Sequence, residues 1–265
     1  MIDYSGKSVL VTGAASGIGA ALSAAFADRG AYVICADIDE EGLDQTLKAL
    51  GGQGEKIVCD LAAADAASVL IGEAFASRGS LALVCSNAGI GHQAKVTDPD
   101  LDFAAIHRLF EINFYAGLKI ANAFANKLSE SAAEGRLLVT TSETSLSLPN
   151  AIRKNRVPYY SASKHALIGA LEWLAIEQVN GPLSIHALIP GAVYTPLISG
   201  RLKDPANAWP ELELIMPERC AEIALKGLDL DLFYIPTQAH ILDDMQPRVD
   251  GVRMALQKLD IKSTV

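Results

Sequence analysis

The chain has 265 residues, half of them apolar and a fifth of them charged. Its formal net charge of -9 at pH 7 opposes attraction to nucleic-acid phosphates and to anionic membrane surfaces, so neither is expected as a partner. No run reaches the roughly 18 to 20 uninterrupted apolar residues of a membrane span, and the N-terminus lacks the pattern of a secretion signal. We therefore expect a soluble, cytoplasmic protein.

Short β-branched runs alternate along the chain with longer segments of helical period. The predicted strands cover residues 8–12, 32–36, 56–60, 81–86, 136–141, 184–189 and 231–236. Apolar positions three and four apart predict helices over residues 17–29, 40–50, 64–77, 101–131 and 159–180, with a terminal helix at about 239–259. This alternation predicts an α/β fold of the Rossmann type, with a doubly wound parallel sheet of about seven strands and helices on both faces.

Neither a repeat nor a linker divides the chain, so we expect one dinucleotide-binding and catalytic domain over residues 1–265. The proline-rich stretch at about 196–216 is expected to form a variable cover over a site, followed by a C-terminal tail at about 237–265. The four cysteines lie far apart without a CxxC pair, and no His-x-x-x-His pair is present, so we expect buried thiols and no metal site.

A glycine-rich turn, TGAASGIG at 12–19, directly follows the first strand and opens a helix. Gly13 permits the tight turn, Gly17 lets a pyrophosphate approach the backbone, and Gly19 lets the helix pack closely on the strand. With Ser16 and Ile18, these residues place the helix N-terminus where it can bind phosphates. The alternative is an ordinary strand-to-helix turn, in which glycines are common.

Asp37 ends the second predicted strand, 20 residues after Gly17. A carboxylate there can accept hydrogen bonds from both hydroxyls of an adenosine ribose and would repel a 2′-phosphate. Neither Ala36 nor Ile38 supplies a compensating arginine, which favours NAD over NADP. The alternative is a solvated turn residue.

The chain resembles the short-chain dehydrogenase/reductase family over about residues 5–200. The motifs that carry the resemblance are TGAASGIG at 12–19, CDL at 59–61, NAG at 87–89, Asn113, Ser142, Tyr160-x-x-x-Lys164, and Pro190-Gly191 followed by Thr195. The resemblance implies contacts to the adenine from Asp60 and Leu61, to the cofactor ribose from Asn87, Ala88 and Gly89, and to the nicotinamide from Pro190, Gly191, Val193 and Thr195. Asp60 could instead cap the next helix, and NAG could be an ordinary turn.

Tyr160 and Lys164 are the candidate acid–base pair. Hydride transfer to or from a carbonyl carbon requires a proton at the oxygen, and a phenol has an unperturbed pKa of about 10. Lys164 lies four residues on, on the same face of a predicted helix, where its charge should lower that pKa. Taken alone, such a spacing is most often a surface pair.

Ser142 follows the fifth predicted strand and could donate to the substrate oxygen, although other hydroxyls between Thr140 and Ser145 compete for this role. The resemblance implies that Lys164 also binds the nicotinamide ribose and that Asn113 holds a water in a proton relay. It further implies a homodimer or homotetramer.

These observations predict an NAD(H)-dependent oxidoreductase that transfers a hydride between nicotinamide and a secondary alcohol or ketone. Apolar residues of the expected cover, Leu197, Ile198, Leu202 and Trp209, suggest a hydrophobic or aromatic substrate. The loop at 149–158, with Arg153, Lys154 and Arg156, is expected to border the substrate entrance. The alternatives are an NADPH-dependent carbonyl reductase and a noncatalytic dinucleotide-sensing protein of the same fold.

Overall fold

Seven parallel strands form one sheet at the centre of the molecule. The computed structural model describes residues 1–200 and 202–261, without the side chains of Ala151 and Lys154, so the basic residue expected at 154 lies outside the description. The strands are β1 (Ser8–Thr12), β2 (Tyr32–Asp37), β3 (Gly54–Val58), β4 (Leu83–Ser86), β5 (Gly135–Thr140), β6 (Leu183–Ile189) and β7 (Tyr234–Pro236). Their order in the sheet is β3-β2-β1-β4-β5-β6-β7, which is the doubly wound arrangement that the sequence predicts.

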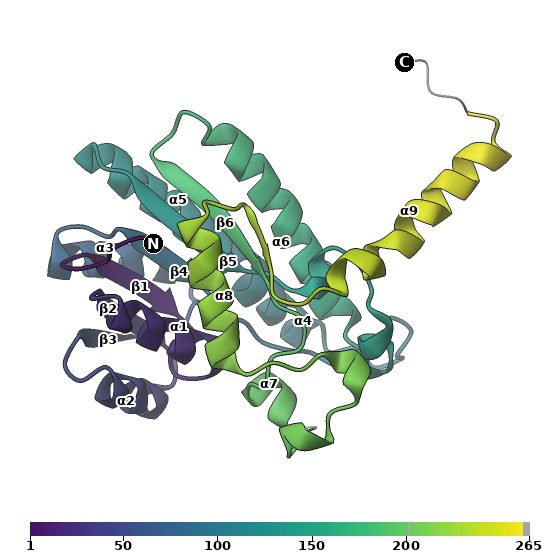
Figure 1. Ribbon diagram of the computed structural model, residues 1–265, viewed down its shortest axis with the longest axis horizontal. Coiled ribbons are helices and arrows are strands. Elements are labelled where there is room, and N and C mark those ends of the chain that lie inside the picture. Colours follow the sequence, from purple (N-terminus) through teal and green to yellow (C-terminus); the bar gives the residue numbers. More distant parts are fainter. Residues whose placement is uncertain (201, 262–265) are drawn as a thin grey trace.

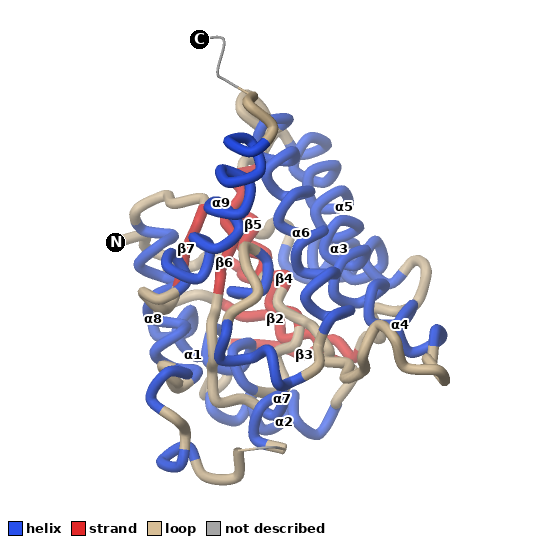
Figure 2. The backbone as a smooth tube through the Cα atoms, turned by 90° about the vertical axis from the view of Figure 1, so that its right-hand side faces the viewer, coloured by secondary structure: helices blue, strands red, loops and turns tan. Residues whose placement is uncertain are grey.

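Helices cover both faces of this sheet. Figure 2 shows α1 (Gly17–Asp28) and α8 (Pro217–Asp229) on one side of the strands, and α3 (Ala66–Arg78), α5 (Ala116–Ser131) and α6 (Pro158–Glu177) on the other. Each face has its own apolar core. Phe26 and Leu43 belong to the core on the side of α1 and α2 (Glu40–Ala49), and Phe124 and Leu171 to the core beneath α5 and α6. The five inner strands are largely buried on both faces, which explains their nearly continuous apolar sequences, whereas the edge strands β3 and β7 are partly exposed.

The long helix predicted over 101–131 consists of three pieces. Asp102 caps the first piece, α4 (Phe103–Phe110), by accepting a hydrogen bond from Ala105 N at 3.0 Å. A π-helical turn (Glu111–Tyr115) then leads into α5. Such single turns occur often at functional sites, and this one contains Asn113.

The region after β6 is more helical than the sequence predicts. After the short α7 (Pro196–Ser199) and two 3₁₀ turns (Pro205–Asn207, Pro210–Leu212), the chain enters α8, a helix absent from the prediction. Pro217 occupies the first helical turn of α8, where proline's missing N–H costs nothing. The predicted terminal helix is present as α9 (Ile241–Lys258), which projects from the body (Figure 1).

Across residues 1–200 and 202–261, the structure contains no helix that is both long enough and apolar enough to span a membrane.

Candidate active site

A cleft of about 540 Å³ opens at the carboxyl ends of the strands, where parallel sheets of this type place their ligands. It is lined by most of the residues singled out from the sequence: Gly13, Ser16, Gly17, Ile18, Asp37, Asp60, Leu61, Asn87, Ala88, Gly89, Ser142, Tyr160, Lys164, Pro190, Gly191, Val193 and Thr195. Gly19 and Asn113 are not on its wall. The structure therefore gathers in one place residues that the sequence spreads over more than 180 positions.

At the glycine turn, neighbouring atoms come so close to the backbone that side chains would not fit, as the sequence predicts. Gly13 and Gly17 have positive φ angles of 67° and 54°. A Cβ atom on Gly19 would lie 2.0 Å from the carbonyl oxygen of Gly13, and one on Gly17 would lie 2.9 Å from Cγ2 of Thr195. The Ser16 side chain does not cap α1, and no acidic residue occupies the first turn of that helix. The turn thus fits a pyrophosphate at the N-terminus of α1.

Asp37 is held in a fixed orientation at the end of β2. Its Oδ2 accepts a hydrogen bond from Ala15 N at 3.1 Å, and its Oδ1 accepts one from Asp39 N at 3.0 Å. These bonds fix the carboxylate on the wall of the cleft. Asp37 is therefore more than a solvated turn residue, and its free lone pairs can accept ribose hydroxyls.

Asp60 lies on the same wall beside Arg108, a residue that sequence reasoning missed. The Arg108 guanidinium contacts Asp60 Oδ2 at 3.1 Å, and Asp60 Oδ1 accepts a hydrogen bond from Ala62 N at 3.0 Å. The bond from Ala62 and the Arg108 guanidinium hold the pKa of Asp60 below its usual range. Arg108 belongs to α4, and no local motif marks it as a neighbour of Asp60.

Asn87 and Ala88 tie the middle strands together. The Asn87 side chain donates to the carbonyl oxygen of Thr12 at 3.2 Å and accepts from the Thr140 hydroxyl at 2.9 Å. The amides of Asn87 and Ala88 donate to the Thr12 hydroxyl at 3.0 and 3.1 Å. This segment joins the ends of β1, β4 and β5, which an ordinary turn would not do.

Tyr160 and Lys164 face the inner end of the cleft from α6. Lys164 is 3% exposed, and its Nζ donates to the carbonyl oxygen of Thr140 at 2.9 Å. The same Nζ lies 6.0 Å from the centre of the Tyr160 ring. The pair is therefore internal and is not the surface pair that such a spacing usually gives.

The expected depression of the Tyr160 pKa is wrong for this structure. Burial raises the pKa of Tyr160, a hydrogen bond with Ser142 lowers it, and the charge of Glu143 raises it. Burial also lowers the pKa of Lys164 to about 8. The expectation considered the charge of Lys164 but not the burial of the phenol, which has the largest effect on the Tyr160 pKa.

Ser142 is the hydroxyl nearest to this chemistry. Its side chain hydrogen-bonds Tyr160 and also accepts from Thr144 N at 3.2 Å. The competing hydroxyls of Thr140 and Thr141 donate elsewhere, at 2.9 Å to Asn87 and 2.8 Å to the carbonyl oxygen of Leu188. The hydroxyl of Ser145 accepts a hydrogen bond from Ser142 N at 3.1 Å.

Asn113 lies behind the cleft, in the π-helical turn. Its Oδ1 accepts from Ile90 N at 2.8 Å, and its Nδ2 donates to Ile90 O at 2.9 Å. A Cβ on Gly89 would lie 3.3 Å from Asn113 Oδ1 and 3.7 Å from Lys164 Nζ. Asn113 and Lys164 thus flank the same glycine without touching in this structure.

The expected substrate residues are only partly brought together. Leu197 and Ile198 line the cleft, whereas Leu202 and Trp209 do not. The described side chains of the loop at 149–158 also stay off the cleft wall; Arg156 accepts a hydrogen bond from Ala94 N at 3.0 Å through its carbonyl oxygen. Ile112 is another cleft residue that sequence reasoning missed; Ile90, Gly91 and Pro196 also line the cleft.

A parallel α/β sheet whose cleft combines a glycine turn at a helix N-terminus with a phenol, a hydroxyl and an ammonium is the arrangement expected of a nicotinamide-dependent oxidoreductase. The chain matches the family described as short chain dehydrogenase over residues 7–206. It therefore belongs to the short-chain dehydrogenase/reductase family, whose members act on hydroxyl and ketone groups.

Individual relatives agree with this assignment. The chain is 33% identical to 1-deoxy-11-beta-hydroxypentalenate dehydrogenase of Streptomyces avermitilis over 236 residues, which cover 88% of this chain and 85% of that protein. It is 30% identical to cis-4-hydroxycyclohexanecarboxylate dehydrogenase of Sinomonas cyclohexanicum, with 88% and 93% covered. A short-chain dehydrogenase/reductase from Burkholderia phymatum, crystallised with NAD, has the same fold with a TM-score of 0.83 at 23% identity, covering 96% of this chain and 97% of that one.

Proposed function

We propose that the protein is an NAD(H)-dependent dehydrogenase of hydrophobic secondary alcohols, acting also in the reverse direction on the corresponding ketones. The observation that carries this proposal is the arrangement of one cleft, with Asp37 and the glycine turn at one end and Tyr160, Ser142 and Lys164 at the other. A hydride-transfer enzyme must bind the nucleotide and transfer the proton in the same cleft, and different residues of this cleft are suited to each task.

Tyr160 exchanges the substrate proton in this proposal. The alcohol oxygen lies beside the phenol, and Ser142, which already bonds Tyr160, donates to the same oxygen and orients the carbon toward the cofactor. An oxidised nicotinamide, when bound, would supply the hydride acceptor and a positive charge near the phenol. The Lys164 ammonium, 6.0 Å from the centre of the Tyr160 ring, would act with that charge against the effect of burial on the Tyr160 pKa.

Lys164 binds the nicotinamide ribose, and Asn113 holds the backbone of Ile90 so that a water can lie between the two side chains. Gly89 leaves that space open because it carries no Cβ. Thr195, Val193 and the Pro190-Gly191 turn hold the nicotinamide amide, while Asp60 and Leu61 contact the adenine.

Asp37 selects NAD over NADP. Its carboxylate is fixed by two backbone amides and accepts the ribose hydroxyls, so a 2′-phosphate would meet a negative charge. The nearby cation, Arg108, is held by Asp60 and does not neutralise Asp37 through any contact that the structure describes.

The substrate is a bulky or cyclic secondary alcohol. Leu197, Ile198 and Ile112 supply apolar surface to the cleft. The relatives named for hydroxypentalenate and hydroxycyclohexanecarboxylate act on ring alcohols, which supports the same class of substrate here. The assignments to one domain and to a homodimer or homotetramer remain predictions.

A panel of cyclic secondary alcohols, offered with NAD and separately with NADP, tests this proposal through the absorbance of the reduced cofactor. We expect turnover with NAD and at least tenfold lower kcat/KM with NADP, since about 1.4 kcal/mol corresponds to that factor. Binding of NAD without oxidation of any alcohol or reduction of any ketone would instead favour a noncatalytic dinucleotide sensor.

A further inference from the structure

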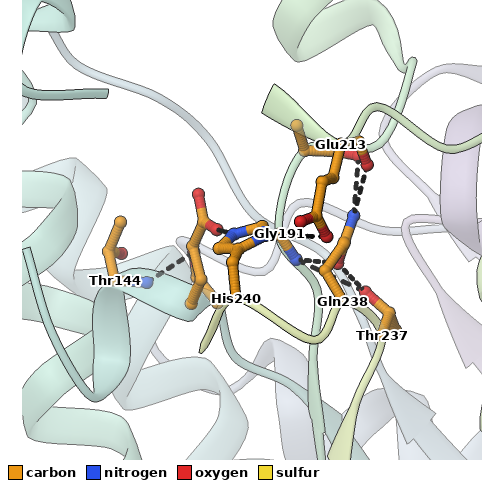
Figure 3. A network of polar contacts seen from close by, with 9 residues as sticks. Thr144, Gly191, Glu213, Thr237, Gln238 and His240 are labelled. Atoms are coloured by element: carbon orange, nitrogen blue, oxygen red, sulfur yellow. Dashed lines mark hydrogen bonds and ion pairs between the residues drawn. The ribbon is translucent and has the colours of Figure 1, made fainter. Parts of the chain in front are cut away.

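The segment that follows β7 reaches back to the wall of the cleft. Gln238 accepts a hydrogen bond from the Gly191 amide at 2.8 Å, and its own amide donates to the carbonyl oxygen of Ala192 at 3.0 Å and of Glu213 at 3.3 Å (Figure 3). Gly191 lines the cleft, whereas Glu213 belongs to the cover. The C-terminal segment therefore joins two loops that border the site.

Two residues further on, His240 lies between two carboxylates, as Figure 3 shows. Its Nε2 is 2.8 Å from Oε2 of Glu143, and its Nδ1 is 3.0 Å from Oε2 of Glu213. The contact between Nδ1 and Glu213 is an ion pair that lacks hydrogen-bond geometry, unlike the contact between Nε2 and Glu143. Since a neutral imidazole can donate from only one ring nitrogen, two facing carboxylates favour the imidazolium.

Glu143 is the buried member of this cluster. Its side chain is 7% exposed, whereas that of Glu213 is 47% exposed. Glu143 directly follows Ser142, and its amide donates to the carbonyl oxygen of Pro190 at 2.8 Å. An uncompensated carboxylate here would be costly, and it would oppose the formation of a second anion on Tyr160.

We propose that His240 is a positioning residue, which as an imidazolium compensates the buried charge of Glu143 and fastens the Ser142 loop to the C-terminal segment, so that Tyr160 can ionise during catalysis. This inference rests on the proposed function, because it takes Tyr160 as the acid–base group. His240 touches neither Tyr160 nor the cleft wall and acts through Glu143.

The titration of the cluster supports this assignment. Burial raises the pKa of Glu143, and the hydrogen bond and charge of His240 lower it. Burial lowers the pKa of His240, but its bonds to Glu143 and Glu213 outweigh burial and raise that pKa above its ordinary value. The charges of Asp244 and Glu213 also act on Glu143 and raise its pKa further.

The sign of the pH dependence follows from these directions. Compensation of Glu143 is complete below the ordinary histidine pKa and is lost as the pH rises through the raised pKa of His240. The charge of Glu143 then acts unopposed on Tyr160 and raises its pKa. This effect is smaller than that of burial, which raises the pKa, and that of the Ser142 hydrogen bond, which lowers it.

The test compares kcat/KM for alcohol oxidation along the rising limb of the pH profile, measured below the raised pKa of His240, where His240 is still an imidazolium and the rate rises with the ionised fraction of Tyr160. His240→Asn keeps a neutral donor but removes the cation, so we expect the rising limb to move up by about one pH unit, the effect of one nearby charge at an effective dielectric constant of about 20. Glu143→Gln should not move it upward, and Glu143→Gln combined with His240→Asn should return it to the position of the unmodified protein.

Arg248→Gln is the matched control. Arg248 also fastens the C-terminal segment, by donating to the carbonyl oxygen of Leu146 at 2.9 Å, but it is exposed and does not contact Glu143. We expect it to leave the limb in place. An unmoved limb in His240→Asn, or an equal upward shift in the double variant, would overturn the proposal.

A second measurement separates this inference from the proposed function. Histidine C–H signals followed by NMR, assigned with His240→Asn, should show His240 titrating above the ordinary value of about 6.5, and Glu143→Gln should lower that pKa. If no alcohol is oxidised, the proposed function fails while this titration still tests the pairing. Titration of His240 at or below the ordinary value would overturn the pairing itself.

Discussion

The two ends of the chain contribute to the cleft in different ways. From β1 to β4, the cleft is made by backbone: glycines that leave room, a helix N-terminus, and side chains fixed by neighbouring amides. After β6, it is held by side chains that bond across distant segments, such as Gln238 to Gly191 and His240 to Glu143. The first kind of site is recorded in local motifs, and the second appears only when the chain is folded.

The difference also separates the two tasks of the site. Nucleotide binding uses the part built from backbone, which tolerates little change in shape. Positioning of the reacting groups depends in addition on the contacts of the C-terminal segment. The match to the family ends at residue 206, before Gln238 and His240, which make those contacts. Variants at each end should therefore fail in different ways.

Lys164→Met should cause a large loss of activity. It removes the buried ammonium beside Tyr160, and we expect kcat to fall by about 10²- to 10⁴-fold, the usual contribution of a group needed for proton transfer. Steady-state kinetics, with cofactor affinity measured by fluorescence, provide the check. Lys119→Met, which removes an exposed lysine paired with Glu111 at 3.1 Å, should leave kcat unchanged; equal losses in both variants would refute the role of Lys164.

Gly19→Ala should damage the part built from backbone. Its Cβ would lie 2.0 Å from the carbonyl oxygen of Gly13, so the turn must move. We expect a loss of about 1–3 kcal/mol in the free energy of unfolding and weaker cofactor binding, measured by denaturant titration and by cofactor fluorescence. Gly72→Ala in α3 meets open space and should be neutral or slightly stabilising; similar results for the two variants would contradict this account of the turn.

Asp37→Ser should change cofactor preference without abolishing activity. Loss of a charged hydrogen-bond acceptor is worth about 1.5–3 kcal/mol, so NAD should bind roughly 10- to 100-fold more weakly, while NADP improves. The ratio of kcat/KM for the two cofactors is the measurement. Asp39→Ser removes a neighbouring carboxylate that caps α2 and does not line the cleft, so it serves as the control and should leave the ratio unchanged.

Arg108→Gln should have the smallest effect. Its pair with Asp60 is about half exposed, and such pairs contribute about 0.2–1 kcal/mol. We expect a rise of no more than about fivefold in the KM for NAD, with kcat unchanged, in initial-rate measurements. A large fall in kcat would mean that Arg108 acts on the reacting end of the cleft.

Much of this molecule could be predicted from its sequence because the decisive signals are local. The seven strands follow short apolar runs, and the glycine turn, Asp37 and the Tyr160–Lys164 spacing each lie within a few residues of the element that positions them. These signals depend on covalent geometry and helix periodicity, which a sequence states directly.

The errors arose where distant contacts or burial decide the outcome. Helix α8 was not predicted, although Pro217 occupies its first turn, a position that proline favours. The pKa of Tyr160 was misjudged because burial of the phenol and of Lys164 depends on packing of the whole domain. Arg108, Gln238 and His240 carry no local motif, so their contacts with Asp60, Gly191 and Glu143 could not be anticipated.

The most direct test of the central claim is single-turnover hydride transfer in Tyr160→Phe. The variant keeps the ring that lines the cleft and removes only the hydroxyl that Ser142 bonds. This account predicts NAD binding close to that of the unmodified protein with hydride transfer to NAD nearly abolished. Undiminished transfer, with the same alcohol and cofactor, would contradict it.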